Sequence, residues 1–383
     1  MRKHNRKIIY LAGFLFYTAL ALTSYINSSF LEQFINKDYL GFVYTAASLV
    51  TILELFQMPK LLQYFGNRRT ILVSTFSTFI ALLLLSLGNS SIIIIPAFIL
   101  YFTSIGLVIS SLDVFIEDFS EKDSIGSFRG FYLMIISLAW VVSQLISGSI
   151  INKSSFEGIY LLSAGFVLLV IFVFSATLHK FKDPIYTRVS VLKTIKTFIR
   201  NKNISKIYLT NFILQFFYAW MVIYTPIYLH EYMHFPWDKI GLIFSIMLLP
   251  FVLLPFPLGK ISDKIGEKKM LIVGFLIIAI SVFIIPFINE SIFYVWALIL
   301  FSTRLGAATV ETMNEAYFFK IITEKNADEI SFFRNASSVA YIIAPFFASM
   351  MLISIPTFKY LYFVLCAIVL IGLLVSLRLR DVR

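Results

Sequence analysis

Long apolar runs separated by short polar breaks follow one another from one end of the chain to the other. A helix needs roughly 20 apolar residues to cross a hydrocarbon core about 30 Å thick. The runs reach this length repeatedly, and we predict twelve membrane-spanning helices at residues 8–31, 38–60, 70–88, 92–115, 130–151, 158–178, 207–230, 239–259, 270–288, 292–317, 335–354 and 359–377. The pattern therefore predicts an all-α membrane protein.

The second half of the chain repeats the first at an offset of 200 residues. Residues 38–43 align with 238–243, residues 66–69 with 266–269, and Gly106 with Gly306; with small slips, Tyr25 aligns with Tyr224 and Phe128-Arg129 with Phe333-Arg334. Parallel repeats of this kind build transporters whose halves rock around a central site. We predict two pseudo-symmetric six-helix bundles, residues 1–178 and 207–383, around a site at mid-membrane.

The segment 179–206 joins the two predicted bundles and is rich in basic residues. Apolar residues recur in it at helical spacing, at Ile185, Val189, Leu192, Ile195 and Ile199. Two interpretations remain open at this point. The segment is either an amphipathic helix lying on anionic lipid headgroups or a solvated cytoplasmic tether.

Composition and charge agree with a protein embedded in the cell membrane. Hydrophobic residues make up 59% of the chain and charged residues only 14%, whereas soluble domains are nearer half apolar and a quarter charged. Of the 31 lysines and arginines other than Arg304, 27 lie on one side of the predicted helices and four on the other, which places both termini in the cytoplasm. The basic residues occupy breaks between spans, so the net charge of +11 does not indicate a nucleic-acid partner.

The beginning of the chain has a second interpretation. Its basic opening, apolar run and Ala19-Leu20-Ala21 resemble a signal peptide with a cleavage site. The first span, however, has a repeat partner in span seven, so we expect it to be retained. Cys366 is the only cysteine, which excludes an intrachain disulfide.

Residues 259–269, GKISDKIGEKK, carry a family resemblance. They resemble the signature loop of the major facilitator superfamily, which lies between the second and third spans of a half. The matching positions are Gly259, Asp263, Gly266, Lys268 and Lys269. The resemblance implies a charged latch at the cytoplasmic face, with glycines that permit a tight turn and close helix approach.

The first-half copy of this loop departs from the pattern. It keeps Gly66, Arg68 and Arg69, but Pro59 and Gln63 replace the glycine and the aspartate. A latch in this half needs another carboxylate, and the candidates at the cytoplasmic end of span four are Asp113, Glu117 and Asp118. We assign Arg129, Arg334 and Glu315 to the same gating regions. Span five lacks the glycine-rich, proline-ended motif of many drug antiporters, which makes drug export the less favoured interpretation.

Ionisable residues at membrane depth are costly and indicate function by default. Arg304, Glu311 and Glu315 share one stripe of span ten at i, i+7 and i+11. The resemblance implies that spans one, four, seven and ten line the transport path. We therefore expect Arg304 to attract an anionic or zwitterionic cargo group and Glu311 to carry a proton, unless the stripe is only an internal charge network. No carboxylate lies inside span one.

Polar side chains on the other spans complete the predicted site, unless they serve as ordinary helix-to-helix hydrogen bonds. The candidates are Asn211, Gln215 and Tyr218 on span seven, Tyr25 on span one, Tyr101 and Ser104 on span four, and Gln144 on span five. Glu54 in span two is predicted to make a structural or gating contact.

The sequence thus predicts a secondary active transporter of a small solute, working by alternating access with ion or proton coupling. We expect a monomer without a cofactor or catalytic residue. Aromatic residues in span seven (Phe216, Phe217, Tyr218, Trp220, Tyr224) favour the alternative of a proton-coupled exporter of amphipathic compounds. A distant alternative is an intramembrane zinc metalloprotease, because His230-Glu231-Tyr232-Met233-His234 fits the H-E-x-x-H pattern.

Overall fold

The computed structural model describes residues 2–119, 125–153, 155–177, 201–321, 333–355 and 357–380, with side chains except those of residues 2–5 and 117–130. Within these ranges the chain is helical and forms no strand. In lipid each backbone N–H and C=O must be paired inside the protein, and a helix achieves this within one segment.

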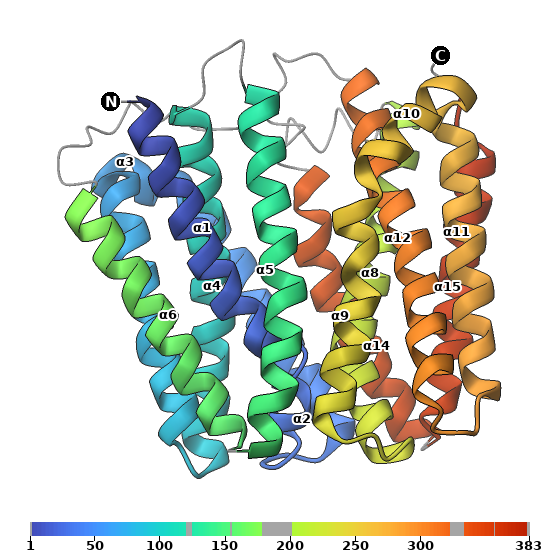
Figure 1. Cartoon of the computed structure of the whole chain (residues 1–383), viewed down its shortest axis with the longest axis horizontal. Coiled ribbons are helices and arrows are strands. Elements are labelled where there is room, and N and C mark those ends of the chain that lie inside the picture. The colour runs from blue at the N-terminus through green and yellow to red at the C-terminus, as the bar shows by residue number, and fades with distance from the viewer. Residues whose placement is uncertain are drawn as a thin grey trace. The chain divides into compact units, whose positions relative to one another are not determined.

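The packing of the helices divides the chain into two units, which Figure 1 shows as ribbons. The first is Met1–Arg188 with Pro236–Ser245, and the second is Val189–Phe235 with Ile246–Arg383. The helices of the first unit are α1 (Arg2–Ser24), α2 (Asn27–Leu31), the 3₁₀ turn η1 (Lys37–Tyr39), α3 (Leu40–Leu87), α4 (Ser91–Phe119), α5 (Ile125–Lys153) and α6 (Phe156–Thr177). In this unit α3 packs against α4 and α6, and α1 packs against α5 and α6.

The second unit contains α8 (Lys202–Ile227), the π-helix η3 (Tyr228–Tyr232), α10 (Pro255–Ile265), α11 (Glu267–Ile284), the 3₁₀ turn η4 (Ile285–Phe287), α12 (Phe293–Ile321), α14 (Ala336–Ser354) and α15 (Lys359–Leu377). Helix α9 (Trp237–Leu253) is divided between the units at Ser245. In the second unit α8 packs against α14, α15 and α12, and α11 packs against α12 and α15. Residues 178–200, most of the predicted linker, lie outside the described residues.

Every predicted span corresponds to a helix. In the described part of the chain, ten helices are long and apolar enough to cross a membrane, or eleven if the bent pair α9 and α10 is one span. One of the ten, Lys37–Leu87, holds two predicted spans, 38–60 and 70–88. If this helix is divided at Gly66, where the backbone is not helical, the ten helices become eleven spans. The bent pair, taken as one span, brings the number to the twelve that were predicted.

Two glycines break helices at equivalent places in the repeat. Gly66 interrupts α3 with φ 75° and ψ 162°, and Gly266 separates α10 from α11 with φ 90° and ψ 145°. A side chain strains this backbone conformation, which is almost confined to glycine. The signature loop therefore turns sharply in both halves, as its glycines predict.

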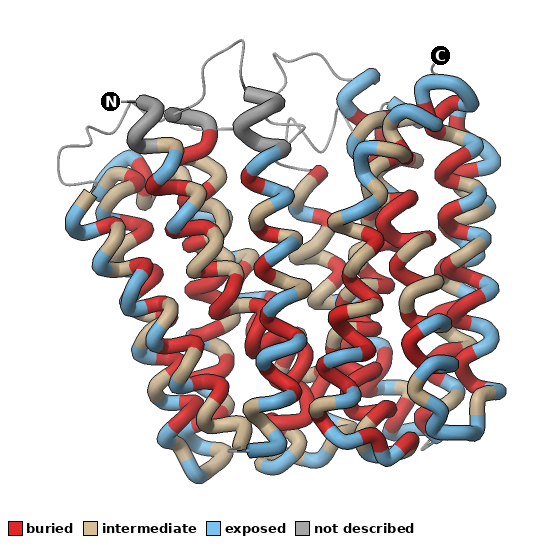
Figure 2. Tube along the Cα trace, viewed as in Figure 1, coloured by how far each residue is buried: buried red, intermediate tan, exposed pale blue. Residues whose placement is uncertain are grey.

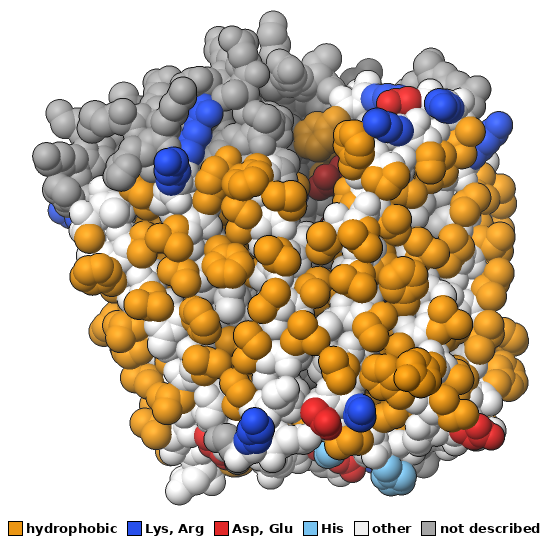
Figure 3. Space-filling model, viewed as in Figure 1, with side chains coloured by type: hydrophobic (Ala, Val, Ile, Leu, Met, Phe, Trp, Pro, Cys, Tyr) orange, Lys and Arg blue, Asp and Glu red, His pale blue; other side chains and the backbone are white. Residues whose placement is uncertain are grey.

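Burial separates an interior from a lipid-facing surface in each unit. Figure 2 shows buried residues on the faces that helices turn toward one another and exposed residues on the outer faces. Figure 3 shows that hydrophobic side chains cover the middle of each unit on the side in view, with charged side chains near the ends. Exposed leucines and phenylalanines such as Leu53, Phe172 and Leu298 belong to this surface.

Candidate transport site

Helices α8 and α12 of the second unit pack against each other (Figure 1). Three residues of the predicted site meet between them. Tyr218 of α8 donates a hydrogen bond from Oη to Glu311 Oε2 of α12 at 2.8 Å. The guanidinium carbon of Arg304, also on α12, lies 5.3 Å from the centroid of the Tyr218 ring and 5.1 Å from that of Phe217. The ring of Tyr218 therefore contacts the cation while its hydroxyl holds the carboxylate.

A cavity of 120 Å³ lies beside this group. Its lining combines two carboxylates, one guanidinium, two amides and two aromatic rings, from Glu311, Glu315, Arg334, Asn211, Gln215, Phe319 and Phe333. A space of this size holds several water molecules or a small solute. Groups of both charge signs reach it, which suits a ligand that carries both charges.

Arg304 does not line this cavity. Its side chain is 1% exposed and is covered by the rings of Phe217 and Tyr218. The sequence predicted one stripe facing the cargo path, but seven residues of helix separate Arg304 from Glu311 by roughly 10 Å along the axis. The structure joins these two residues through Tyr218.

Asn211 has a structural contact as well as a place in the cavity wall. Its Nδ2 donates to the backbone oxygen of Phe333 at 3.0 Å, just before α14 begins. The Phe333 ring stacks on Phe318 of α12 with 4.0 Å between centroids. Asn211 therefore fixes one side of the cavity, while Gln215, one turn further along α8, lines it.

The first-unit candidates hold helices together. Tyr101 Oη and Thr23 Oγ1 are 2.5 Å apart, and Ser104 accepts a hydrogen bond from Thr78 at 2.9 Å. Gln144 Nε2 donates to the backbone oxygen of Ala21 at 2.7 Å. The Tyr25 ring lies 4.7 Å from that of Phe244. These contacts are hydrogen bonds and ring packing between helices, which is the alternative role that the sequence left open for these residues.

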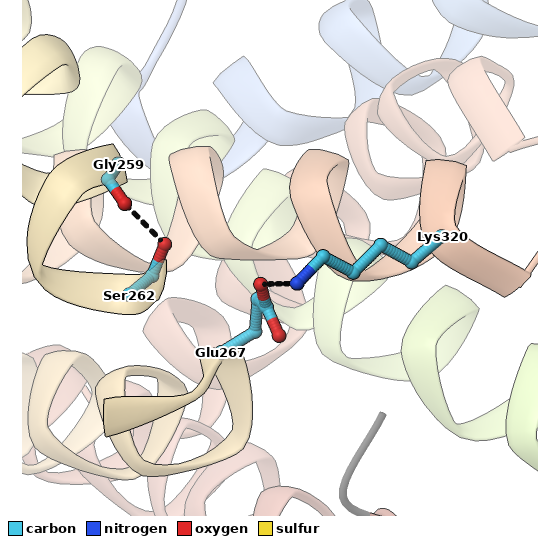
Figure 4. A network of polar contacts seen from close by, with 4 residues as sticks. All are labelled: Gly259, Ser262, Glu267 and Lys320. Atoms are coloured by element: carbon cyan, nitrogen blue, oxygen red, sulfur yellow. Dashed lines mark hydrogen bonds and ion pairs between the residues drawn. The ribbon is translucent and has the colours of Figure 1, made fainter. Parts of the chain in front are cut away.

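The second-half signature loop contains an ion pair that the sequence did not predict (Figure 4). Glu267, the first residue of α11, is 1% exposed, and its Oε1 accepts from Lys320 Nζ at 2.5 Å. Asp263, the predicted carboxylate of the latch, is exposed and forms no ion pair with a described residue. The position of each residue in its helix favours the pair. Glu267 lies in the first turn of α11 and Lys320 in the last turn of α12, where an acidic and a basic side chain, respectively, interact favourably with the helix dipole.

The first-half loop makes a neutral contact at the equivalent position. Asn67, which aligns with Glu267, is fully buried and donates from Nδ2 to the backbone oxygen of Ser111 at 2.9 Å. Both loops therefore tie the residue after the glycine to the neighbouring α4 or α12. No neighbouring helix packs closely enough at position 259 to require a glycine, because a Cβ added to Gly259 would meet nothing within 4 Å. Its backbone oxygen accepts from Ser262 Oγ at 2.8 Å (Figure 4).

The remaining gate candidates lie at or near these loops. Arg68, Lys268 and Asp113 are half-buried, whereas Arg69 and Lys269 are exposed. The side chains of Glu117 and Arg129 lie outside the described residues. Glu315 and Arg334 line the cavity described above.

The H-E-x-x-H segment does not form the helical turn that this motif requires. Tyr228–Tyr232 is a π-helix, and His234 lies beyond it with φ 53°. The ring nitrogen Nδ1 of His230 is 3.0 Å from the backbone oxygen of Phe235. Two histidines bind one zinc ion in this motif because a regular helix presents both on one face, and this backbone does not do so.

Comparisons with known proteins agree with the helical architecture. A family model described as the Major Facilitator Superfamily matches residues 9–239 and 208–383. No curated protein matches the chain.

Two solved structures share the fold. One is titled as a POT family transporter in complex with 5-aminolevulinic acid, with TM-score 0.80 and 13% identity over 98% of this chain and 96% of that one. The other is titled for substrate recognition in proton dependent oligopeptide transporters, with TM-score 0.74 and 13% identity over 98% of both chains. By the match of the family model along its whole length, the chain belongs to the Major Facilitator Superfamily.

Proposed function

We propose that this protein is a proton-coupled transporter of a small zwitterionic solute, working by alternating access with both termini in the cytoplasm. The contact group of Arg304, Tyr218 and Glu311 beside the cavity carries the proposal. It joins a cation, a hydroxyl and a carboxylate within the membrane-spanning part of one unit.

Glu311 has the chemistry of a proton carrier. Its carboxylate is held by a neutral donor, the Tyr218 hydroxyl, at 2.8 Å. The hydroxyl stabilises the ionised form without cancelling its charge, so both protonation states are accessible at this position. Taking up a proton forms an O–H bond on the carboxylate, and the proton returns to water when the site opens to the other side.

The cavity supplies partners for both ends of a zwitterion. An ammonium group of the solute would bind Glu311 or Glu315, and its carboxylate would bind the Arg334 guanidinium, which can form two parallel hydrogen bonds. Arg304 takes a different role from the predicted one. We infer that it fixes Tyr218, and through it Glu311, rather than contacting the solute.

The two solved structures named above give the proposal a chemical starting point. One of them binds 5-aminolevulinic acid, and the other is concerned with oligopeptide transport. Both ligand types carry an amine and a carboxylate. At 13% identity these likenesses establish the fold alone, so the solutes serve here as probes.

The aromatic residues of α8 do not favour the exporter alternative. Phe216, Trp220 and Tyr224 are 3% exposed or less, and their rings pack against one another. Trp220 and Tyr224 also contact Phe347 and Phe358 of the second unit. These rings form the packed core of the unit, and none of them lines the cavity.

The test uses the full-length protein in lipid vesicles that enclose a pH-sensitive dye. Dialanine and 5-aminolevulinic acid are the zwitterionic probes, with putrescine and succinate as single-sign controls. We expect inward proton flux with a zwitterion only. In Glu311→Gln, proton-driven accumulation should be lost while exchange of labelled probe across the membrane persists.

Glu290→Gln is the matched control, because it removes an exposed carboxylate from a loop and should change neither measurement. Full accumulation by Glu311→Gln would contradict the assignment of the proton to Glu311. Absence of flux with every zwitterion would contradict the proposed cargo class.

A further inference from the structure

One carboxylate at membrane depth has no part in the site described above. Glu54 lies on α3 between Leu40, where the helix begins, and Gly66, where it is broken. At 1.5 Å per residue, roughly 21 Å and 18 Å of helix separate Glu54 from these two points. Since the hydrocarbon core is about 30 Å thick, Glu54 lies well inside it.

Glu54 is half-buried and lies at the edge of the face of α3 that packs inside the unit, since Val50 at i−4 is 39% exposed and Gln57 at i+3 is also exposed. Ala47, Thr51 and Met58, at i−7, i−3 and i+4, are all buried, whereas Leu53 and Phe56 on the other side are 61% and 55% exposed. The methyl group of Thr51 lies 2.8 Å from the position that a Cβ on Gly106 of α4 would take. Glu54 therefore borders the α3–α4 contact.

No described residue compensates the Glu54 carboxylate. One of its two oxygens, Oε2, is buried, and among the described residues it has neither a hydrogen-bond partner nor an ion pair. Charged groups on the helices packed against α3 do not supply one. Helix α4 offers Asp113, of the same sign, α6 has only Glu157 in its first turn, and Lys37 and Asp38 of η1 lie beyond the start of α3.

An ionised carboxylate is unfavourable in such a place, because burial of Oε2 at membrane depth removes part of its hydration and no described residue replaces it. The neutral acid avoids this cost. No described residue supplies the partner that a structural or gating contact of Glu54 requires. A group for which the neutral acid is favoured here, and which can ionise when more water reaches it, has the property of a coupling site.

We propose that Glu54 is a second proton-binding residue, which carries a proton in the conformation seen here and releases it to water when the cycle exposes α3. The release breaks the O–H bond of the acid and leaves a carboxylate and a hydrated proton. Its role in the cycle rests on the proposed proton coupling, but its protonation does not.

The repeat shows that this group is particular to the first unit. The position equivalent to Glu54 is Leu254, at the break between α9 and α10. The second unit has its proton-carrying candidate on α12 instead, at Glu311. The two units would then contribute one proton-binding carboxylate each, from helices that are not equivalent in the repeat.

Infrared difference spectroscopy of the full-length protein in lipid tests the protonation directly. We expect a carbonyl band of a protonated carboxyl group at neutral pH that is lost in Glu54→Gln and shifted in Glu54→Asp. Glu157→Gln, a change at the end of α6, should leave the band in place. Melting temperature and elution volume identify a variant that fails to fold, and Glu54→Asp then carries the test alone.

Two results would overturn the proposal. The first is a spectrum of Glu54→Gln that matches the wild type at every pH. The second is a band in the wild type that sodium ions abolish, since this would identify a cation site. The vesicle assay separates this inference from the proposed function. If the band is lost in Glu54→Gln but the wild-type protein shows no dialanine-driven proton flux, the proposed coupling is contradicted and the protonation of Glu54 is not. With flux present, the number of protons per dialanine should fall in Glu54→Gln.

Discussion

The ion pair between Glu267 and Lys320 should respond unequally to the loss of its two members. Glu267 is 1% exposed at the start of α11, whereas the Lys320 side chain is 43% exposed at the end of α12. Removing the lysine leaves a buried carboxylate without its cation. Removing the glutamate leaves an ammonium group that water can reach.

The magnitudes follow from this difference in burial. Breaking a fully buried pair costs about 3–5 kcal/mol, and exposed pairs contribute about 0–1 kcal/mol. The positive end of the α11 dipole stabilises Glu267 by roughly 1 kcal/mol even without Lys320. We therefore expect Lys320→Met to destabilise the protein by about 2 kcal/mol and Glu267→Gln by about 1 kcal/mol.

Thermal unfolding of the purified protein in one detergent measures this order. Lys320→Met should melt lowest, and the double variant Glu267→Gln with Lys320→Met should melt above Lys320→Met alone because no buried charge remains. Lys269→Met, which removes an exposed cation of the same loop, is the control. A double variant no more stable than Lys320→Met, or a larger loss in Glu267→Gln, would refute the reasoning.

Three further predictions address the turn, the site and the topology. Gly266→Ala should lower stability by about 1–3 kcal/mol because φ is 90° there, whereas Gly259→Ala, in open helical space, should not lower it, and melting temperatures compare the two. Tyr218→Phe removes the hydroxyl that holds Glu311 but keeps the ring beside Arg304, so proton-driven uptake should fall several-fold with little change in melting temperature; unchanged uptake would separate Tyr218 from coupling. Reporter fusions after Lys7, at Lys193 and after Arg383 should be cytoplasmic and those near Ser90 and Asn289 external, and an external C-terminus would contradict the twelve-span orientation.

The spans and the sharp turns could be predicted from the sequence because each depends on local chemistry. A run of apolar residues is sufficient to specify a membrane helix, since the hydrocarbon excludes any segment that leaves its backbone unpaired. The break at Gly266 was predictable for a similar reason, because few residues other than glycine adopt that backbone conformation. The family followed from the same loop, whose spacing is itself a local pattern.

The partners of the site residues could not be predicted in this way. Glu267 and Lys320 are 53 residues apart, and Tyr218 and Glu311 are 93. Helical periodicity placed Arg304 and Glu311 on one stripe, but only the packing of α8 against α12 put an aromatic ring over the cation and a hydroxyl on the carboxylate. The same kind of packing, in the first unit, gives Tyr101 and Gln144 hydrogen bonds to the neighbouring helix α1, which could not be predicted either.

The sequence by itself determined which segments enter the membrane, where they turn and to which family the chain belongs. The tertiary structure alone decided which charges meet, because a hydrogen bond or an ion pair depends on distances of a few ångströms between helices that are far apart in the chain. For Glu54 the packing around α3 brings none of the described residues to the carboxylate as a partner.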